Sequence, residues 1–326
     1  MVTSNLYHQP PVDYQKFSTV EWVMILMMMC IIATLSLINP HNVAVWSLAS
    51  IGHETAVLGI IALGALMVFH VNEYDLSLGA TFAFSLMTFS MLSNTLSPFI
   101  AMLLIIPLVG VIGFVNGIIS VTVGSTLVVT FTMMFIIRGV VFFLCDGMPS
   151  TSQPGTTVAV WESLGWGEVW GLPTSILVFL ALVGALEAFF RRSTTGRNLI
   201  AIGLGGRRAR FCGISTRHYK IFAFIFAALT ALLASTIFYA RLNTASPNIG
   251  MRLPFDALAI VIISNAGLQR RLPSPSRIFI ITILLVIIQH QLEFLGLQPE
   301  VSYVMAGILV LSTLLIDLTV TEHPRR

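Results

Sequence analysis

The clearest pattern in the chain is a series of long apolar runs, separated by short segments that contain Gly, Pro or charged residues. An α-helix needs about 20 mainly apolar residues to cross the ~30 Å hydrocarbon core of a bilayer. The pattern therefore predicts an all-α integral membrane protein, a polytopic bundle of about ten transmembrane helices. The expected spans are residues 21–38, 54–71, 76–94, 98–121, 126–144, 174–190, 220–240, 255–269, 277–292 and 301–318.

A half-helix is possible in two places, because the boundary at 71–76 is weakly defined and the run at 255–269 is short.

Composition supports the membrane assignment. Charged residues make up 10% of the chain and apolar residues 56%, whereas about a quarter of a soluble domain is charged. From Leu76 to Ile137 the chain has no Asp, Glu, Lys or Arg. The formal charge of +3 is too small to indicate a nucleic-acid partner.

Lys and Arg predict the orientation of the bundle, because cytoplasmic loops carry an excess of both. Most of the 17 basic residues lie at 191–220, at 270–277 and at the last two positions. With the N-terminus inside, an alternating series of spans places all three regions in the cytoplasm. Loop 145–173 contains acidic residues but no Lys or Arg, and it then lies outside. We expect both termini to be cytoplasmic.

This orientation divides the chain into a cytoplasmic N-terminal segment at 1–20, a transmembrane domain at 21–318 and a cytoplasmic tail at 319–326. Within the domain, the outer loop 145–173 contains three tryptophans. Tryptophan is enriched at the membrane–water interface, so we expect an interfacial loop with a short helix lying flat on the membrane. The largest cytoplasmic loop spans 191–219.

Charged groups inside the membrane are candidates for function, because each costs at least ~2.5–3.5 kcal/mol at the bilayer centre. Asp75 and Ser77 stand two residues apart, where they either cap the next helix or line a pathway. Arg138 lies deep in its span and can snorkel, pair with Asp75 or Asp256, or face a polar cavity. Asp256 is either a cap or a pathway residue.

Enzyme and metal motifs are missing from the sequence. The segment from Gly203 to Arg208 lacks the Gly-Lys-Ser/Thr ending of a phosphate-binding loop. The seven histidines form no HExxH motif, and the three cysteines have no ligand spacing. We therefore expect no enzyme activity, no metal and no bound cofactor.

Six segments, in order and in spacing, resemble the permeases of ribose-type ABC importers over residues 40–318. In the first half these are Asp75-Leu76-Ser77-Leu78-Gly79 and the segment from Val129 to Met134 with Arg138-Gly139. In the second half they are Thr195–Gly203, Arg210–Ile214, Ala240–Gly250 and Phe255–Ile262. By this resemblance the chain is identified as a diverged member of that family, with the fold of an ABC importer permease.

The resemblance implies the membrane-spanning permease subunit of an ATP-binding cassette importer in the bacterial inner membrane. The substrate would be a monosaccharide or related small polyol, such as a ribose-like sugar or an autoinducer-2-like molecule. The implied partners are a second permease subunit, a periplasmic sugar-binding protein, membrane lipid and a cytoplasmic ABC ATPase subunit, which would use the ATP. Motif position makes Asp75, Ser77, Arg138 and Asp256 the pathway candidates. The candidates for the ATPase-coupling loop are Gly203, Gly205, Gly206, Arg207, Arg210 and Gly213.

The chain departs from the family pattern in two places. The glycine-rich segment that follows the Phe255–Ile262 helix in the family reads Ser264–Pro273 here and has lost most of its glycines. The cytoplasmic Gly-Gly-Asn-Glu is reduced to Gly205-Gly206. We expect one half of a heterodimer whose partner keeps the consensus, with a homodimer as the alternative.

Two other function classes stay open at this point. An ion-coupled secondary transporter would use Asp75, Arg138 and Asp256 as a charge relay and would stop when an uncoupler is added. A membrane-embedded enzyme would need a cluster of His, Asp or Glu near one membrane face, which the sequence does not indicate.

Overall fold

The computed structural model describes residues 19–38, 45–151, 159–265, 272–298 and 300–321. Twelve α-helices occur in these ranges: α1 (Thr19–Ile38), α2 (Val45–Phe69), α3 (Leu78–Ser93), α4 (Pro98–Val123), α5 (Thr126–Leu144), α6 (Ala159–Trp166), α7 (Thr174–Arg192), α8 (Thr194–Phe211), α9 (Thr216–Leu242), α10 (Leu253–Asn265), α11 (Pro275–Phe294) and α12 (Glu300–Thr321). The expected terminal segments at 1–20 and 319–326 lie largely outside the described residues, as does part of the segment that lost the family glycines.

Each of the ten expected spans overlaps one helix, and α6 and α8 form within the two long loops. Six helices in the described part of the chain are long and apolar enough to cross a membrane: α2, α4, α5, α7, α9 and α11. Shorter apolar helices occur within α1 and α12 and at α3 and α10. These findings confirm an all-α, multi-pass membrane protein, and the number of ten crossings stays a prediction.

Helix boundaries differ from the sequence expectation mainly at α2 and α10. The helix α2 begins at Val45, well before residue 54, because His53 and Glu54 are accommodated inside it. The helix α10 has 13 residues and ends at Asn265. Residues 70–77 connect α2 to α3 without helical structure.

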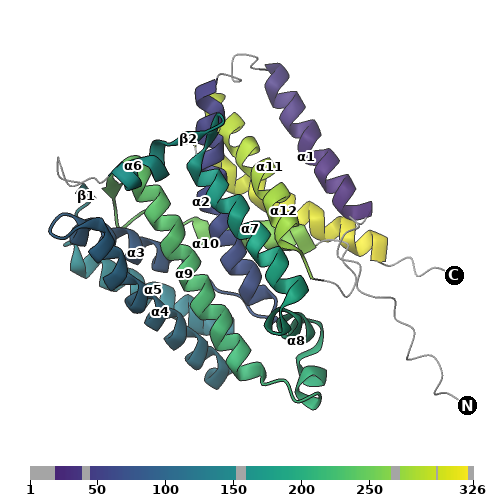
Figure 1. The fold of residues 1–326 in the computed structure, drawn as a ribbon. Coiled ribbons are helices and arrows are strands. Elements are labelled where there is room, and N and C mark those ends of the chain that lie inside the picture. The colour runs from purple at the N-terminus through teal and green to yellow at the C-terminus, as the bar shows by residue number, and fades with distance from the viewer. Residues whose placement is uncertain (1–18, 39–44, 152–158, 266–271, 299, 322–326) are drawn as a thin grey trace, which may run out of the picture.

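Four two-residue strands join the loops at the end of the bundle opposite α8 (Figure 1). Strand β1 (Ser150–Thr151) pairs antiparallel with β4 (Thr244–Ala245), and β2 (Glu168–Val169) pairs with β3 (Leu172–Pro173). The β1–β4 pair fastens the loop after α5 to the end of α9. The short helix α6 packs against α9 at the same end.

The centre of the bundle is α9, which packs against α2, α3 and α4. Its buried face is rich in alanine, and α4 meets it through Gly113 and Gly117. A Cβ atom on Gly113 would lie 2.7 Å from the Cα atom of Ile225, and one on Gly117 would lie 2.8 Å from the Cα atom of Ile221. Small residues four positions apart allow two helix backbones to approach closely in a membrane.

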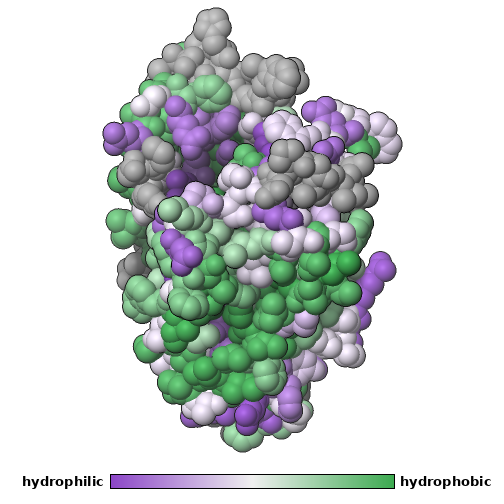
Figure 2. All heavy atoms as spheres, turned by 90° about the vertical axis from the view of Figure 1, so that its left-hand side faces the viewer, coloured by the Kyte–Doolittle hydropathy of each residue, from purple (hydrophilic) through white to green (hydrophobic). Residues whose placement is uncertain are grey.

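The outer surface is apolar over α4 and α5. Leu103 is 71% exposed and Phe143 is 83% exposed, and many neighbouring Leu, Ile, Val and Phe side chains are also exposed. Figure 2 shows this face as a broad hydrophobic band, with hydrophilic residues gathered above and below it. A soluble protein rarely exposes so large an apolar patch, and lipid chains cover such a surface without cost.

The glycine contact between α4 and α9 gives a first prediction. We expect Gly113→Ala to destabilise the protein by about 1–3 kcal/mol, because the added methyl group overpacks against the backbone of α9. The matched control is Gly110→Ala on the same helix, where a Cβ atom would meet nothing within 4 Å. Thermal unfolding in detergent should show a lower Tm for the first variant and an unchanged or higher Tm for the second. Equal Tm values would contradict the contact.

Candidate functional site

Two cavities lie at opposite ends of α2 and α9. The first, the α8 cavity, measures about 750 Å³ and is lined by the residues that follow α2, by α8 and by the start of α9. The second, the four-helix cavity, measures about 330 Å³ and is lined mainly by α2, α9, α10 and α11. Lys220 lines the first and Arg241 the second, about 30 Å apart along α9 at ~1.5 Å per residue. The two cavities are thus separated by roughly the thickness of the hydrocarbon core.

The first half of α8 is fixed to its neighbours. Ser193 caps the helix, since its hydroxyl accepts a hydrogen bond from the backbone N–H of Gly196 at 2.8 Å. A Cβ atom on Gly196 would lie 2.4 Å from the carbonyl oxygen of Phe189, so the corner between α7 and α8 needs glycine. Farther along, the side-chain amide of Asn198 donates to the hydroxyl of Tyr219 at 2.7 Å. This bond ties α8 to the start of α9.

The four predicted glycines of this loop have different surroundings. Gly203 packs against the chain that follows α2, where a Cβ atom would lie 2.6 Å from the carbonyl oxygen of His70. Gly205 leaves the helical conformation and kinks α8, and a Cβ atom on Gly206 would meet nothing within 4 Å. Gly213 has a φ of 81°, which strongly favours glycine.

Gly213 also completes the C-terminal cap of α8. Its N–H donates to the carbonyl oxygen of Arg210, and the N–H of Ile214 donates to that of Ala209, both at 3.0 Å. This pair of bonds is the Schellman arrangement that closes many helices. The turn is therefore a defined structure rather than a loose end.

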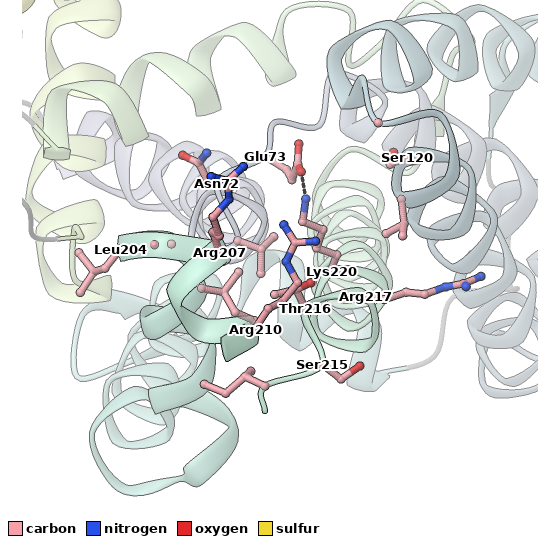
Figure 3. A pocket seen from close by; sticks show the side chains of 18 residues that line it. Asn72, Glu73, Ser120, Leu204, Arg207, Arg210, Ser215, Thr216, Arg217 and Lys220 are labelled. Carbon is pink, nitrogen blue, oxygen red and sulfur yellow. Dashed lines mark hydrogen bonds and ion pairs between the residues drawn. The ribbon is translucent and has the colours of Figure 1, made fainter. Parts of the chain in front are cut away.

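The α8 cavity is strongly basic. Arg207 and Arg210, both predicted from the sequence, line it together with Arg217 and Lys220. In Figure 3, Lys220 faces Glu73 and Arg217 points away from this pair. The ion pair of Lys220 with Glu73 joins the start of α9 to the segment after α2.

Sequence reasoning missed two features of this region. The Glu73–Lys220 pair connects residues far apart in the chain, so no local pattern marks it. Phe211, beside Arg210 at the end of α8, is 86% exposed. Phe211 could have been noticed in the sequence, because it is an aromatic residue within a basic loop. Aromatic residues and Arg are enriched at protein–protein interfaces.

Asp75 and Ser77 lie in a buried polar network at the start of α3. One carboxylate oxygen of Asp75 accepts hydrogen bonds from the backbone N–H and the hydroxyl of Ser77, at 2.8 and 2.6 Å. The side-chain amide of Asn116 on α4 donates to the same hydroxyl at 2.7 Å. These bonds form a turn just before α3, and the side chain of Ser77 makes no capping bond to the helix. Both residues lie outside the lining of the two cavities.

The guanidinium of Arg138 donates hydrogen bonds to backbone carbonyl oxygens rather than to a carboxylate. It donates to the carbonyl oxygens of Pro247, of Ile249 at 3.0 Å and of Gly79 at 3.5 Å. The sequence had left snorkelling, a carboxylate partner or a polar cavity open, and the structure gives a fourth arrangement. Arg138 thus links α5 to α3 and to the segment that leads into α10.

Asp256 is the pathway candidate that lines the four-helix cavity. Its carboxylate forms an ion pair at 2.6 Å with Arg252, which directly precedes α10. The cavity brings in further polar groups that the sequence did not place together: His53 and Glu54 from α2, and Gln289 and Glu293 from α11. Glu54 and Glu293 come from two different helices and line this one shared cavity.

Arg241 at the end of α9 closes one side of the four-helix cavity. Its guanidinium donates to the hydroxyl of Ser50 on α2 at 2.9 Å and lies over the ring of Trp166, 5.2 Å from the centroid. The loop that contains Trp166 is therefore in direct contact with the cavity wall.

The network at Asp75 gives a second prediction. Asp75→Ala removes the acceptor of two buried hydrogen bonds, so we expect a loss of about 1–3 kcal/mol in the free energy of unfolding. Asp75→Asn keeps an acceptor oxygen and should remain closer to the wild type. Thermal unfolding and uptake should be measured on both. Normal stability of Asp75→Ala together with lost uptake would instead support contact with a substrate.

Comparison with known proteins agrees with this architecture. The ribose import permease protein of Haemophilus influenzae is 27% identical over 293 residues, which cover 88% of this chain and 90% of that protein. The ribose import permease protein of Escherichia coli K12 is 25% identical over 313 residues, covering 94% and 97%. The L-arabinose transport system permease protein of the same organism is 22% identical over 280 residues, covering 85% and 84%.

No solved structure matches this chain. A family model does: the family described as the branched-chain amino acid transport system permease component matches residues 47–314. These residues include both cavities and every helix from α2 to α11, together with most of α12. The chain belongs to the family of branched-chain amino acid transport system permease components.

Proposed function

We propose that this chain is the membrane-spanning permease subunit of an ATP-binding cassette importer for a monosaccharide or related small polyol. The relatives named as ribose and L-arabinose permeases support this proposal. The observation that carries it is the end of α8, an exposed tip with Phe211 and Arg210 that continues through a capped turn into α9. An exposed aromatic residue beside an arginine is typical of a surface that binds a partner protein.

The partner of this tip is a cytoplasmic ABC ATPase, which binds and uses ATP, whereas this chain binds no cofactor. The first half of α8 is held by the Asn198–Tyr219 bond, and the Glu73–Lys220 pair joins α9 to the chain after α2. A displacement of the tip is therefore passed to α9 and α2 as a rigid-body movement. The positive-inside rule supports a cytoplasmic position for this end and for both termini.

Two further partners complete the importer. A periplasmic sugar-binding protein delivers substrate at the opposite end, where α6 and the paired strands lie. A second permease subunit, of the same or a related sequence, pairs with this one in the inner membrane. The altered segment at 264–273 favours a related partner that keeps the family glycines.

The structure weighs against the ion-coupled alternative. A charge relay through Asp75, Arg138 and Asp256 requires these groups to contact one another. Instead Asp75 accepts from Ser77, Arg138 donates to backbone carbonyls, and Asp256 pairs with Arg252. Each charge is stabilised locally, as expected for a structural role.

Uptake of labelled D-ribose by cells that express the whole importer tests the proposal. We expect inactivation of the ATPase subunit to abolish uptake and a proton uncoupler to leave the initial rate in ATP-replete cells largely intact. L-leucine serves as the comparison substrate, since the family description names amino acids. Uptake that survives loss of the ATPase, or uptake of L-leucine instead of sugars, would contradict it.

The α8 tip gives a more local prediction. We expect Phe211→Ala to weaken binding of the ATPase and to lower uptake roughly tenfold or more, because truncating an interface anchor costs about 2 kcal/mol or more. Cys212→Ser is the matched control, an exposed neighbour in the same turn. Copurification of the ATPase and uptake should fall together for the first variant only. Equal effects of both variants would show that the turn, and not the Phe211 side chain, matters.

A further inference from the structure

The four-helix cavity contains polar groups that the fold does not use. His53 on α2 lines the cavity and is 4% exposed, yet neither of its ring nitrogens has a hydrogen-bond partner among the described residues. The side-chain nitrogen of Gln289 on α11 lines the same cavity and is likewise without a partner in the described part of the chain. Buried polar groups are nearly always hydrogen-bonded, and each exception needs an explanation.

Of the charged groups around them, the two arginines make contacts with other residues of the chain. Arg241 donates a hydrogen bond to Ser50 and lies over the ring of Trp166. Arg252 forms an ion pair with Asp256. Glu54 on α2 and Glu293 on α11 line the same cavity. The lining therefore offers two carboxyl groups, an imidazole and an amide for hydrogen bonds to a ligand.

This set of groups selects the chemistry of a ligand. Carboxylate, imidazole and amide groups exchange hydrogen bonds with hydroxyl groups, which both donate and accept. Phe82 and Phe238 add apolar walls. An anion or the carboxylate of an amino acid would need an excess of positive charge, and this lining holds two guanidinium groups against the three carboxyl groups of Glu54, Asp256 and Glu293. The volume of about 330 Å³ lies at the lower end of the range for ligand sites, which suits one small molecule.

We propose that the four-helix cavity is a binding site for one neutral, polyhydroxylated small molecule, held by His53, Glu54, Gln289 and Glu293. This inference rests on the proposed function and deepens it: the permease chain itself recognises its substrate at the end opposite α8. The site lies within one chain, between α2, α9, α10 and α11. It adds residues that the sequence motifs did not indicate.

The decisive variant is His53→Leu, which keeps the volume of the side chain but removes both ring nitrogens. Since these atoms have no partner in the described part of the chain, their loss should leave Tm unchanged or raise it. Loss of a hydrogen bond to the substrate should raise the half-saturating concentration of D-ribose roughly threefold to tenfold. Gln289→Leu provides a second, independent variant with the same expectation.

Direct occupancy is measured by thiol labelling of the complete importer. In a chain whose Cys30, Cys145 and Cys212 are replaced by serine, Leu242→Cys places a thiol in the cavity lining. Met251→Cys is the matched control, since Met251 is also exposed and does not line the cavity. D-ribose at about ten times its dissociation constant should slow labelling by a membrane-impermeant thiosulfonate roughly tenfold at position 242 and leave position 251 unaffected.

The outcomes separate the two proposals. The wild-type importer can take up D-ribose in an ATPase-dependent way while His53→Leu and Gln289→Leu leave the half-saturating concentration of D-ribose unchanged. That result contradicts the binding site and supports the proposed function. Protection of position 242 by L-leucine but not by D-ribose also overturns the site as described. If the wild type shows no ATPase-dependent uptake at all, the proposed function is contradicted, and with it the binding site that rests on it. Raised half-saturation at normal Tm, with protection confined to position 242, supports the site.

Discussion

Close packing of α9 against α2 and α4 is the constraint on which the rest of the structure depends. Gly113 and Gly117 bring α4 against the backbone of α9, and Gly64 does the same for α2, where a Cβ atom would lie 3.2 Å from the Cα atom of Ala227. Larger residues at these positions would separate the helices. Because no hydrophobic driving force acts between helices in lipid, such close contacts supply much of the association energy.

The same packing fixes the two cavities relative to each other. A hydrogen bond joins α2 to α9 beside the four-helix cavity, where Ser50 accepts from Arg241. Beside the α8 cavity, an ion pair joins Lys220 of α9 to Glu73 in the segment that follows α2. With the glycine contact between these bonds, α2 and α9 behave as one rigid unit. Force applied to the tip of α8 therefore has a direct physical route to the four-helix cavity, as the proposed coupling to an ATPase subunit requires.

Features set by local composition were predictable from the sequence, and features set by tertiary contact were not. Apolar runs marked the helices because bilayer thickness dictates their length, and basic loops marked Arg207 and Arg210. The carbonyl partners of Arg138 and the pairing of Glu73 with Lys220 arise from segments far apart in the chain. His53 and Gln289 meet only because α2 and α11 pack together, so neither residue stands out in its own segment. The Gly113–Gly117 spacing was a readable signal of close helix contact.

The central claim is that the two ends of this rigid unit move together. It is tested most directly by the thiol-labelling rate of Leu242→Cys in the complete importer, measured with and without ATP. The account predicts a several-fold change in the rate when ATP binds, since rocking of α2 and α9 opens or closes the four-helix cavity. An identical rate in both states, in a complex that hydrolyses ATP and takes up substrate, would contradict it.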